Sequence, residues 1–335
     1  MDAAAPPGAV LPPGVRGTAG AGAARRAHGA GARCRGVRSG HRLAAQPVVP
    51  ADSRTGRGPV VRRGARAFAA VLAALAMTVV AGCSGAGDPR PPEPSGPSGS
   101  TATEVWRPRP GLAWQWQLDG RVDPSVDVPV YDIDGFENDA ADVARLYRAG
   151  RKVICYVNVG AWEDFRPDRD AFPRSVLGEP NGWRGERWLD IRRLSVLRPI
   201  MERRFDMCRD KGFDAVEPDL VEGYADETGF PLTARDQLAY NRMIAAIAHE
   251  RGLAVGLKND LPQIPQLVDD FDFAVNEQCA EYGECARLAP FVAAGKAVFH
   301  VEYDEPTRRF CAQSRRLGLS SMLKRPELGV WREPC

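Results

Sequence analysis

The sequence is poor in histidine, in closely spaced cysteines and in long apolar runs, and each shortage argues against a class of protein. Its 4 histidines are scattered over 335 residues, and no two of its 8 cysteines have the CxxC spacing of a zinc-ligand pair. No phosphate-binding glycine loop and no Ser-His-Asp arrangement stands out. The apolar run 67–81 is too short to span a bilayer comfortably. We therefore expect a protein that works without a metal or other cofactor.

Lysine is absent from residues 1–83, which hold 12 Arg against 2 Asp. The formal net charge of +2 hides this asymmetry, because the rest of the chain has 33 basic and 41 acidic residues, a net of −8. An acidic working part argues against a nucleic acid as the partner. It is compatible with a cationic substrate.

The first 105 residues divide into three segments by composition. Residues 1–60 are rich in Ala, Gly, Pro and Arg without a periodic apolar face, which predicts disorder. Residues 61–83 have arginines followed by a short apolar run, as a signal peptide does, and end in Val80-Ala81-Gly82-Cys83. This ending resembles a bacterial lipobox and predicts lipidation of Cys83; a plain secretory signal with an incidental cysteine is the alternative. Residues 84–105, rich in Pro, Ser and Gly, predict a flexible linker. The chain is then expected at the extracellular face of the cell membrane, or secreted.

Residues 106–335 alternate between strand and helix patterns. The expected strands are 113–118, 128–133, 152–157, 215–218, 254–258, 273–276, 297–302 and 319–323. The expected helices are 137–149, 195–211 and 233–251, with shorter ones near 264–268, 284–294 and 306–317. Eight strands, mostly followed by helices, predict an α/β fold, a single-domain (β/α)8 TIM barrel. The first connection has no obvious helix, and the loop 160–193 is long enough to be a lid or a subsite wall.

Polar residues gather at the carboxyl ends of the predicted strands, where barrels of this type build their sites. Two of them, Asp219 in GFDAVEPD and Glu277 in FAVNEQC, are candidates for a catalytic pair. Acids at the end of a buried strand are costly unless they are paired, hydrated or used. Glycoside hydrolysis requires two carboxylates that flank the scissile bond, about 5–5.5 Å apart for retention and about 6.5–9.5 Å apart for inversion. The alternative is that both acids simply face solvent.

Several segments resemble one known family. VYDIDGFE, ICYVNVGAWE, ERWLDIR, GFDAVEPD, GLKND, NEQC and VEY, in this order, are similar to glycoside hydrolase family 114, the endo-α-1,4-polygalactosaminidases. The resemblance covers residues 106–323 and implies a (β/α)8 barrel that cleaves α-1,4-linked galactosamine polymers without a metal. By their motifs it implies Asp219 as nucleophile and Glu277 as general acid/base. The chain departs from the family at Leu220, where the family often has Asn after the aspartate.

The other strand-end residues are predicted to bind substrate, with a purely structural role as the alternative for each. Asp132, Asp134 and Glu302 would supply negative potential around ammonium groups. Lys258 would lower the pKa of the nucleophile by favouring its charged form. The hydroxyls of the sugar would be bound by Tyr156, Asn158, Asn259 and Tyr303. Flat faces for sugar rings are offered by Trp116 and by Trp114, Trp162, Trp183 and Trp188, although each is also a packing candidate.

Six cysteines follow the predicted linker, an even number in a chain that is expected to be exported, which indicates disulfides. We predict the pairs Cys155–Cys208, Cys279–Cys285 and Cys311–Cys335, with a zinc site as the alternative. His249 and His300 are predicted to be structural. The expected partner is then a polysaccharide substrate. The protein is expected to be a monomer, and to contact the membrane only through its lipid anchor. Two other readings are a hydrolase of another α-linked polysaccharide and a non-catalytic barrel that binds cell-surface sugar.

Overall fold

The structure is a computed structural model that describes residues 105–335. The predicted disordered extension, the signal peptide with Cys83 and nearly all of the linker lie outside the described residues. Among the helices that are described, none combines the length and the apolar character needed to cross a membrane.

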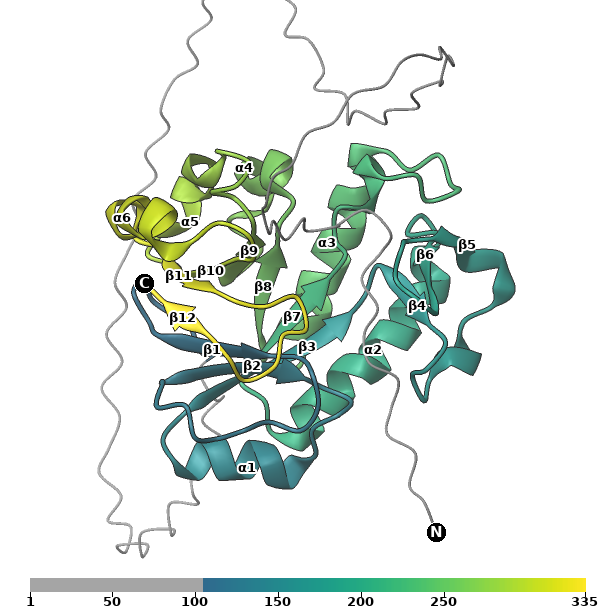
Figure 1. Ribbon diagram of the computed structural model, residues 1–335. Helices are drawn as coiled ribbons and strands as arrows, with labels where there is room; N and C mark the ends of the chain where they lie inside the picture. The colour runs from purple at the N-terminus through teal and green to yellow at the C-terminus, as the bar shows by residue number, and fades with distance from the viewer. Residues whose placement is uncertain (1–104) are drawn as a thin grey trace, which may run out of the picture. The chain divides into compact units, whose positions relative to one another are not determined.

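The main sheet contains eight parallel strands that follow one another in chain order (Figure 1). They are β1 (Trp114–Gln117), β2 (Val130–Asp134), β3 (Lys152–Asn158), β7 (Ala215–Asp219), β8 (Ala254–Lys258), β9 (Phe273–Glu277), β10 (Val298–Glu302) and β11 (Ser320–Leu323). Each neighbouring pair is parallel. All eight predicted strands are therefore present, and the prediction of a (β/α)8 barrel is confirmed.

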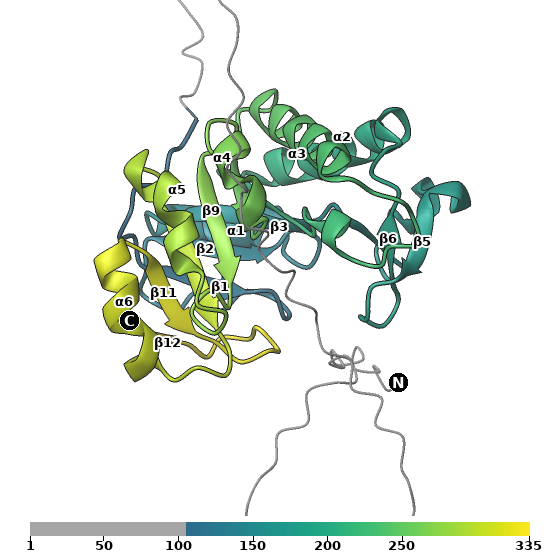
Figure 2. The same ribbon diagram turned by 90° about the horizontal axis from the view of Figure 1, so that it is seen from above.

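Helices lie in the connections between the strands, around the outside of the sheet (Figure 2). They are α1 (Ala140–Arg148), α2 (Leu194–Lys211), α3 (Ala234–His249), α4 (Ile264–Leu267), α5 (Ala289–Ala293) and α6 (Thr307–Leu317). Short 3₁₀ turns occupy Arg169–Ala171, Arg174–Val176, Gly223–Ala225, Leu261–Gln263 and Cys285–Leu288. The connection from β1 to β2 has no helix, as expected. α1 begins three residues later than predicted, because Asp139 and Asp142 form a capping box at its start.

Alternate residues of the strands fill the interior of the barrel, since successive side chains of a strand point to opposite faces. One buried cluster contains Trp114, Trp116, Val130, Ile154, Ala215, Ala254, Phe273, Val275, Phe299, Val301 and Met322. A larger cluster, built from the other face of the strands, packs against the helices. On β2, β3, β7, β8 and β9 the inner face ends in polar residues at the carboxyl rim, which places those side chains over the apolar interior.

The end of the chain runs along the seam between β11 and β1. β12 (Glu333–Pro334) pairs antiparallel with β11, and the backbone N–H of Leu118 donates to the carbonyl of Leu328. The indole N–H of Trp114 donates to the carbonyl of Ser320 at 2.9 Å, which joins the first strand directly to the last. A Cys311–Cys335 disulfide ties the terminus to α6. With Cys155–Cys208 and Cys279–Cys285, all three predicted disulfides are confirmed.

The long segment after β3 folds into a small antiparallel sheet that stands beside the barrel (Figure 1). Its strands are β4 (Ala161–Glu163), β5 (Leu177–Pro180) and β6 (Glu186–Leu189), in the order β4-β6-β5. A buried ion-pair network fastens it to the barrel: Arg166 binds Asp134 at 2.6 Å, and Arg204 of α2 binds Glu163 at 3.3 Å. Sequence periodicity missed this sheet because strands of three or four residues are too short to show it.

Candidate active site

The ammonium group of Lys258, at the end of β8, lies at the centre of the carboxyl rim. Its Nζ is 3.0 Å from Oε1 of Glu217, 3.0 Å from Oδ1 of Asp219 and 3.2 Å from Oε2 of Glu277. Asp219 ends β7 and Glu277 ends β9, the strands on either side of β8. One buried cation therefore holds the two predicted catalytic carboxylates on the same rim. Their side chains keep 17% and 25% of their surface exposed, so both remain open to a substrate.

Two tyrosines complete the surroundings of this pair. Tyr156 donates to Oδ2 of Asp219 at 2.7 Å, and Tyr303 donates to Oε1 of Glu277. Burial and the adjacent carboxylate raise the pKa of each tyrosine well above its usual range, so both hydroxyls keep their protons. The side-chain oxygen of Asn259 accepts from the backbone N–H of Glu277 at 2.9 Å, which fixes the end of β9.

The charge of Lys258 sets the ionisation of Asp219. Burial alone would raise the pKa of Asp219, but Lys258, Tyr156 and the backbone N–H of Leu220 favour the charged form and lower it. Burial likewise would lower the pKa of Lys258, yet Asp219, Glu217 and Glu277 raise it well above its usual range. Asp219 is therefore placed as an ionised carboxylate beside a charged lysine.

Glu217 was not among the residues predicted for the site. It lies two residues before Asp219 on the same face of β7, is 0% exposed, and accepts from the indole N–H of Trp116 at 3.0 Å. Burial raises its pKa. The period of two along a strand could have revealed it, because Ala215, Glu217 and Asp219 must share one face.

Trp116 and Asp132 lie deeper than predicted, below Lys258. Trp116 is 1% exposed, with the Lys258 ammonium 4.9 Å from its ring centroid, so its face is covered and offers no platform for a sugar. Asp132 is 0% exposed on β2, beside Trp116 in the strand register. Neither residue reaches the surface where a substrate could bind, which corrects both predictions.

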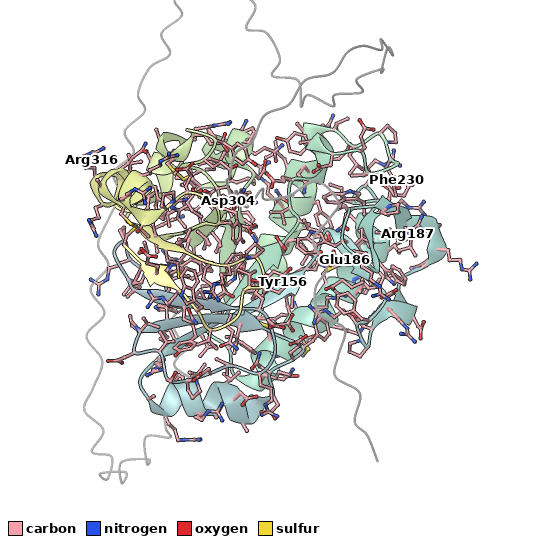
Figure 3. The ribbon with its side chains drawn as sticks, in the orientation of Figure 1. Tyr156, Glu186, Arg187, Phe230, Asp304 and Arg316 are labelled. Atoms are coloured by element: carbon pink, nitrogen blue, oxygen red, sulfur yellow. A yellow bond between two sulfur atoms is a disulfide. The ribbon has the colours of Figure 1, made fainter. Side chains whose placement is uncertain are left out.

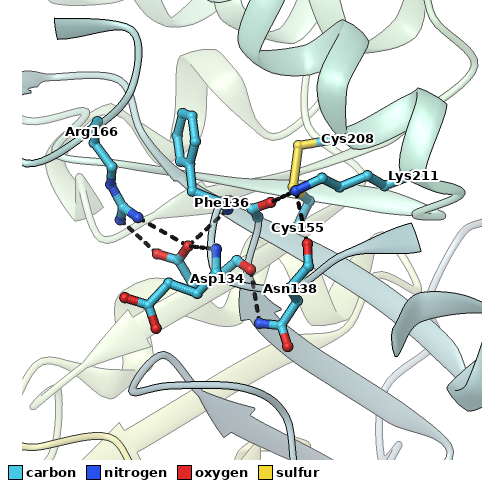
Figure 4. The surroundings of a disulfide bond; sticks show 9 residues. Asp134, Phe136, Asn138, Cys155, Arg166, Cys208 and Lys211 are labelled. Carbon is cyan, nitrogen blue, oxygen red and sulfur yellow. Dashed lines mark hydrogen bonds and ion pairs between the residues drawn. A yellow bond between two sulfur atoms is a disulfide. The ribbon is translucent and has the colours of Figure 1, made fainter. Parts of the chain in front are cut away.

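Asp134, Asn158 and Glu302 are also held within the protein. Asp134 binds Arg166 and accepts from the backbone N–H of Phe136 (Figure 4). Asn158 accepts from the backbone N–H groups of Gly160 and Ala161. Glu302 is on the outer face of β10, opposite in direction to Tyr303, and accepts from His300 at 2.7 Å. These three predicted substrate ligands therefore shape the loops of the rim instead. His300 binds Glu302 through one ring nitrogen and Ser321 through the other, so it has a structural role, as expected.

The backbone is left-handed directly after the three central strands. Residues Leu220, Asn259 and Gln278 have φ of 60°, 48° and 62°. A non-glycine residue in this region costs about 1–3 kcal/mol, and such strain clusters at functional sites. Asn adopts this conformation far more readily than Leu. Leu220 is therefore poorly suited to the turn that it forms, while its backbone N–H favours the charged form of Asp219.

A cavity of about 220 Å³ opens beside Glu277. Its walls are formed by Glu222, Asn259, Leu261, Glu277, Gln278, Tyr282 and Glu284. The disulfide-closed loop from Cys279 to Cys285 forms one wall and presents Tyr282, which is 65% exposed. Burial raises the pKa of Glu222 to about 7. The cavity is thus acidic, with an aromatic ring at its edge.

Glu186, from the small sheet, lies beside Tyr156, the tyrosine that donates to Asp219 (Figure 3). It accepts from Asn181 at 2.8 Å and from Asn158 at 3.3 Å, and burial raises its pKa to about 7. Glu186 opens the segment ERWLDIR, which resembles the family, but the strand that carries it is too short for its period to mark this side chain as a site residue.

Within residues 105–335, Cys279, Cys285 and His300 are close enough together to hold a metal. The two sulfur atoms form a disulfide, and a disulfide offers no thiolate to a metal. The zinc alternative for these cysteines is therefore wrong for the folded, oxidised chain.

A (β/α)8 barrel has the fold of many glycoside hydrolases, and its two partly exposed carboxylates, at the ends of the strands on either side of β8, resemble their acidic pair. The sequence matches the model of glycoside hydrolase family GH114 over residues 96–335. The chain belongs to this family, as the resemblance predicted, and is a glycoside hydrolase.

Solved structures agree with this assignment. Ega3 of Aspergillus fumigatus, solved in complex with galactosamine, is 40% identical; the match covers 71% of this chain and 100% of that one, with a TM-score of 0.65. The glycoside hydrolase domain of PelA from Pseudomonas aeruginosa is 16% identical over 67% of this chain and 98% of that one, with a TM-score of 0.54, and supports the fold alone. No curated protein matches the chain.

Proposed function

We propose that this protein is an exported, endo-acting glycoside hydrolase that cleaves α-1,4-linked galactosamine polysaccharide with Asp219 and Glu277. The observation that carries the proposal is the contact of both carboxylates with one ammonium group, at 3.0 and 3.2 Å. The 40% identity to a protein solved with galactosamine supports the substrate class.

The shared ammonium also favours a stereochemical outcome. Oδ1 of Asp219 and Oε2 of Glu277 cannot be farther apart than about 6.2 Å, the sum of their distances to Nζ of Lys258. Inverting enzymes need about 6.5–9.5 Å between their carboxyl groups to admit a water, whereas retaining enzymes have about 5–5.5 Å. We therefore propose a retaining mechanism through a covalent glycosyl-enzyme.

In the first step, a carboxylate oxygen of Asp219 attacks the anomeric carbon while the glycosidic bond breaks. Glu277 gives its proton to the leaving oxygen. In the second step, Glu277 takes a proton from water, whose oxygen displaces Asp219 at the same carbon. Lys258 keeps Asp219 ionised for the attack, and the hydroxyl of Tyr156 holds its second oxygen in place.

The acidic cavity beside Glu277 suits one aminosugar unit of such a polymer. Its carboxyl groups, on Glu222 and Glu284, are complementary to an ammonium substituent, and Tyr282 offers a flat face to the ring. The excess of acidic residues after Cys83 favours a cationic polymer in the same way. Three disulfides fit an oxidising compartment outside the cytoplasm, and we propose anchoring through Cys83.

The test is hydrolysis of defined α-1,4-galactosamine oligomers by Asp219→Asn and Glu277→Gln, with product masses as the readout. Each variant is expected to lose at least about 1,000-fold in kcat, because each removes one of the two reacting groups. Asp210→Asn, on the exposed outer face of α2, is the matched control and should hydrolyse like the wild type. Wild-type turnover by either site variant would remove that residue from the mechanism. Binding of the oligomers by the wild type without any shortening would identify a carbohydrate-binding protein instead.

A further inference from the structure

Two carboxyl groups that cannot touch a substrate lie beneath the catalytic pair. Asp132 of β2 and Glu217 of β7 are both 0% exposed. Glu217 is partnered: it accepts from Trp116 and contacts the Lys258 ammonium at 3.0 Å. In the described part of the chain, neither oxygen of Asp132 has a hydrogen-bond donor to accept from. An ionised carboxylate left in this way would be very costly inside a protein.

The chemistry of Asp132 allows one way to avoid this cost. A protonated carboxyl is a hydrogen-bond donor, and Glu217 is a nearby acceptor: Trp116, which is paired with Asp132 in the strand register, donates its indole N–H to Glu217 at 3.0 Å. Burial and the charge of Glu217 raise the pKa of Asp132 well above its usual range. The titratable groups that surround Glu217 and Lys258 are Asp132, Tyr156, Asp219, Glu277 and Tyr303.

We propose that Asp132 and Glu217 hold a single proton, located on Asp132, and that the remaining charge on Glu217 makes it the positioning residue of Lys258. The proposal rests on the proposed glycosidase function. The first step requires an ionised Asp219 and a proton on Glu277. Lys258 must therefore favour the ionised form of Asp219 without equally favouring loss of the proton from Glu277. A fixed negative charge on its inner side, 3.0 Å away, offsets part of the lysine charge. Without the proton on Asp132, two buried negative charges would lie there instead of one.

The first measurement needs no catalytic activity, so its outcome is independent of the proposed function. Infrared difference spectra of the full-length wild type and Asp132→Asn are compared at pH 7. The wild type is expected to show the carbonyl stretch of one additional protonated carboxylic acid, which Asp132→Asn lacks. A difference spectrum that contains an ionised carboxylate in its place would overturn the proposal.

The second measurement is the pH dependence of kcat and KM on galactosamine oligomers. Glu217→Gln keeps an oxygen for the Trp116 indole but removes the charge. Its alkaline limb should move to lower pH by about one unit, with a fall in kcat and little change in KM, because the lysine charge is no longer offset. Asp132→Asn replaces a neutral acid with a neutral amide that still donates to Glu217. It should move neither limb, although its kcat falls by less than about tenfold through altered packing.

The two variants together decide the proposal. If Asp132→Asn and Glu217→Gln displace the limbs of the pH profile equally, Asp132 carries a negative charge and not a proton. That result would overturn the proposal. If the pH profiles of both variants coincide with that of the wild type, Glu217 does not position Lys258. Absence of hydrolysis by the wild type refutes the proposed function and leaves the infrared result to stand by itself.

Discussion

Replacement of Lys258 by methionine removes the charge that holds the site together and keeps the length of the side chain. Lys258 contacts three carboxylates at 3.0, 3.0 and 3.2 Å. An opposite charge at such distances lowers the pKa of a carboxyl by about 1–3 units. Burial, which acts to raise the pKa of Asp219, then dominates. We expect the acid limb of kcat/KM to move upward by about 1–3 pH units in Lys258→Met.

The same variant should lose stability. Removal of one partner from a buried ion pair costs about 3–5 kcal/mol. Because the pKa of Asp219 is lowered on folding, its contribution to stability is present above the unfolded pKa and is lost as pH falls through the folded pKa. Lys258→Met should lack this contribution, so its deficit against the wild type should shrink as the solution is acidified toward pH 3.

The assay is kcat/KM on galactosamine oligomers from pH 4 to pH 9, with urea unfolding at each pH to keep measurements within the folded range. Lys152→Met is the matched control: Lys152 binds Asp214 at 2.5 Å but is 40% exposed and lies at the start of β3, away from the carboxyl rim. It should leave the pH profile in place. An acid limb in Lys258→Met that coincides with the wild type would refute the electrostatic reasoning.

Three further predictions concern the support of the site. In Gly160→Ala, the added Cβ would lie 1.8 Å from the carbonyl oxygen of Leu220, so the turn after β7 must shift and kcat should fall about 100-fold; unchanged kcat in a folded variant would show that the turn yields freely. Loss of the Cys155–Cys208 disulfide, which spans 53 residues, should cost about 4 kcal/mol in urea unfolding of the double Ser variant, and a cost below about 1 kcal/mol would contradict the loop-entropy estimate. Burial raises the pKa of Glu222 to about 7, so its contribution to stability is present below its unfolded pKa and is lost as pH rises through 7. Glu222→Gln should therefore gain stability relative to the wild type between pH 5 and pH 8. A difference in Tm that does not depend on pH would exclude this.

The barrel was predictable because its strands are long enough to show their period and are separated by helices with clear ends. The capping box at Thr233 and Asp236 begins α3 where the sequence indicated. The position of Asp219 and Glu277 at one rim follows from the same regularity, since the carboxyl ends of parallel strands meet at one edge.

The depth of each polar side chain was not predictable from strand ends alone. Asp132 and Asp219 are both acids on the inner face, yet the stagger of the strands puts the first beneath Lys258 and the second beside it. Glu302 was assigned to the site although Phe299 and Val301 define the inner face of β10, which leaves Tyr303 as the residue that points inward. By the period of two along a strand, Glu302 lies on the opposite face, toward the helices.

The most direct test of the proposed mechanism is the configuration of the newly formed reducing end. Proton NMR during the first minutes of hydrolysis of an α-1,4-galactosamine oligomer resolves the two anomers before they equilibrate. Attack by Asp219 followed by attack of water on the same carbon inverts the centre twice, so we predict the α-anomer as the first product. The β-anomer as the first product would contradict the assignment of Asp219 as nucleophile and the close spacing on which it rests.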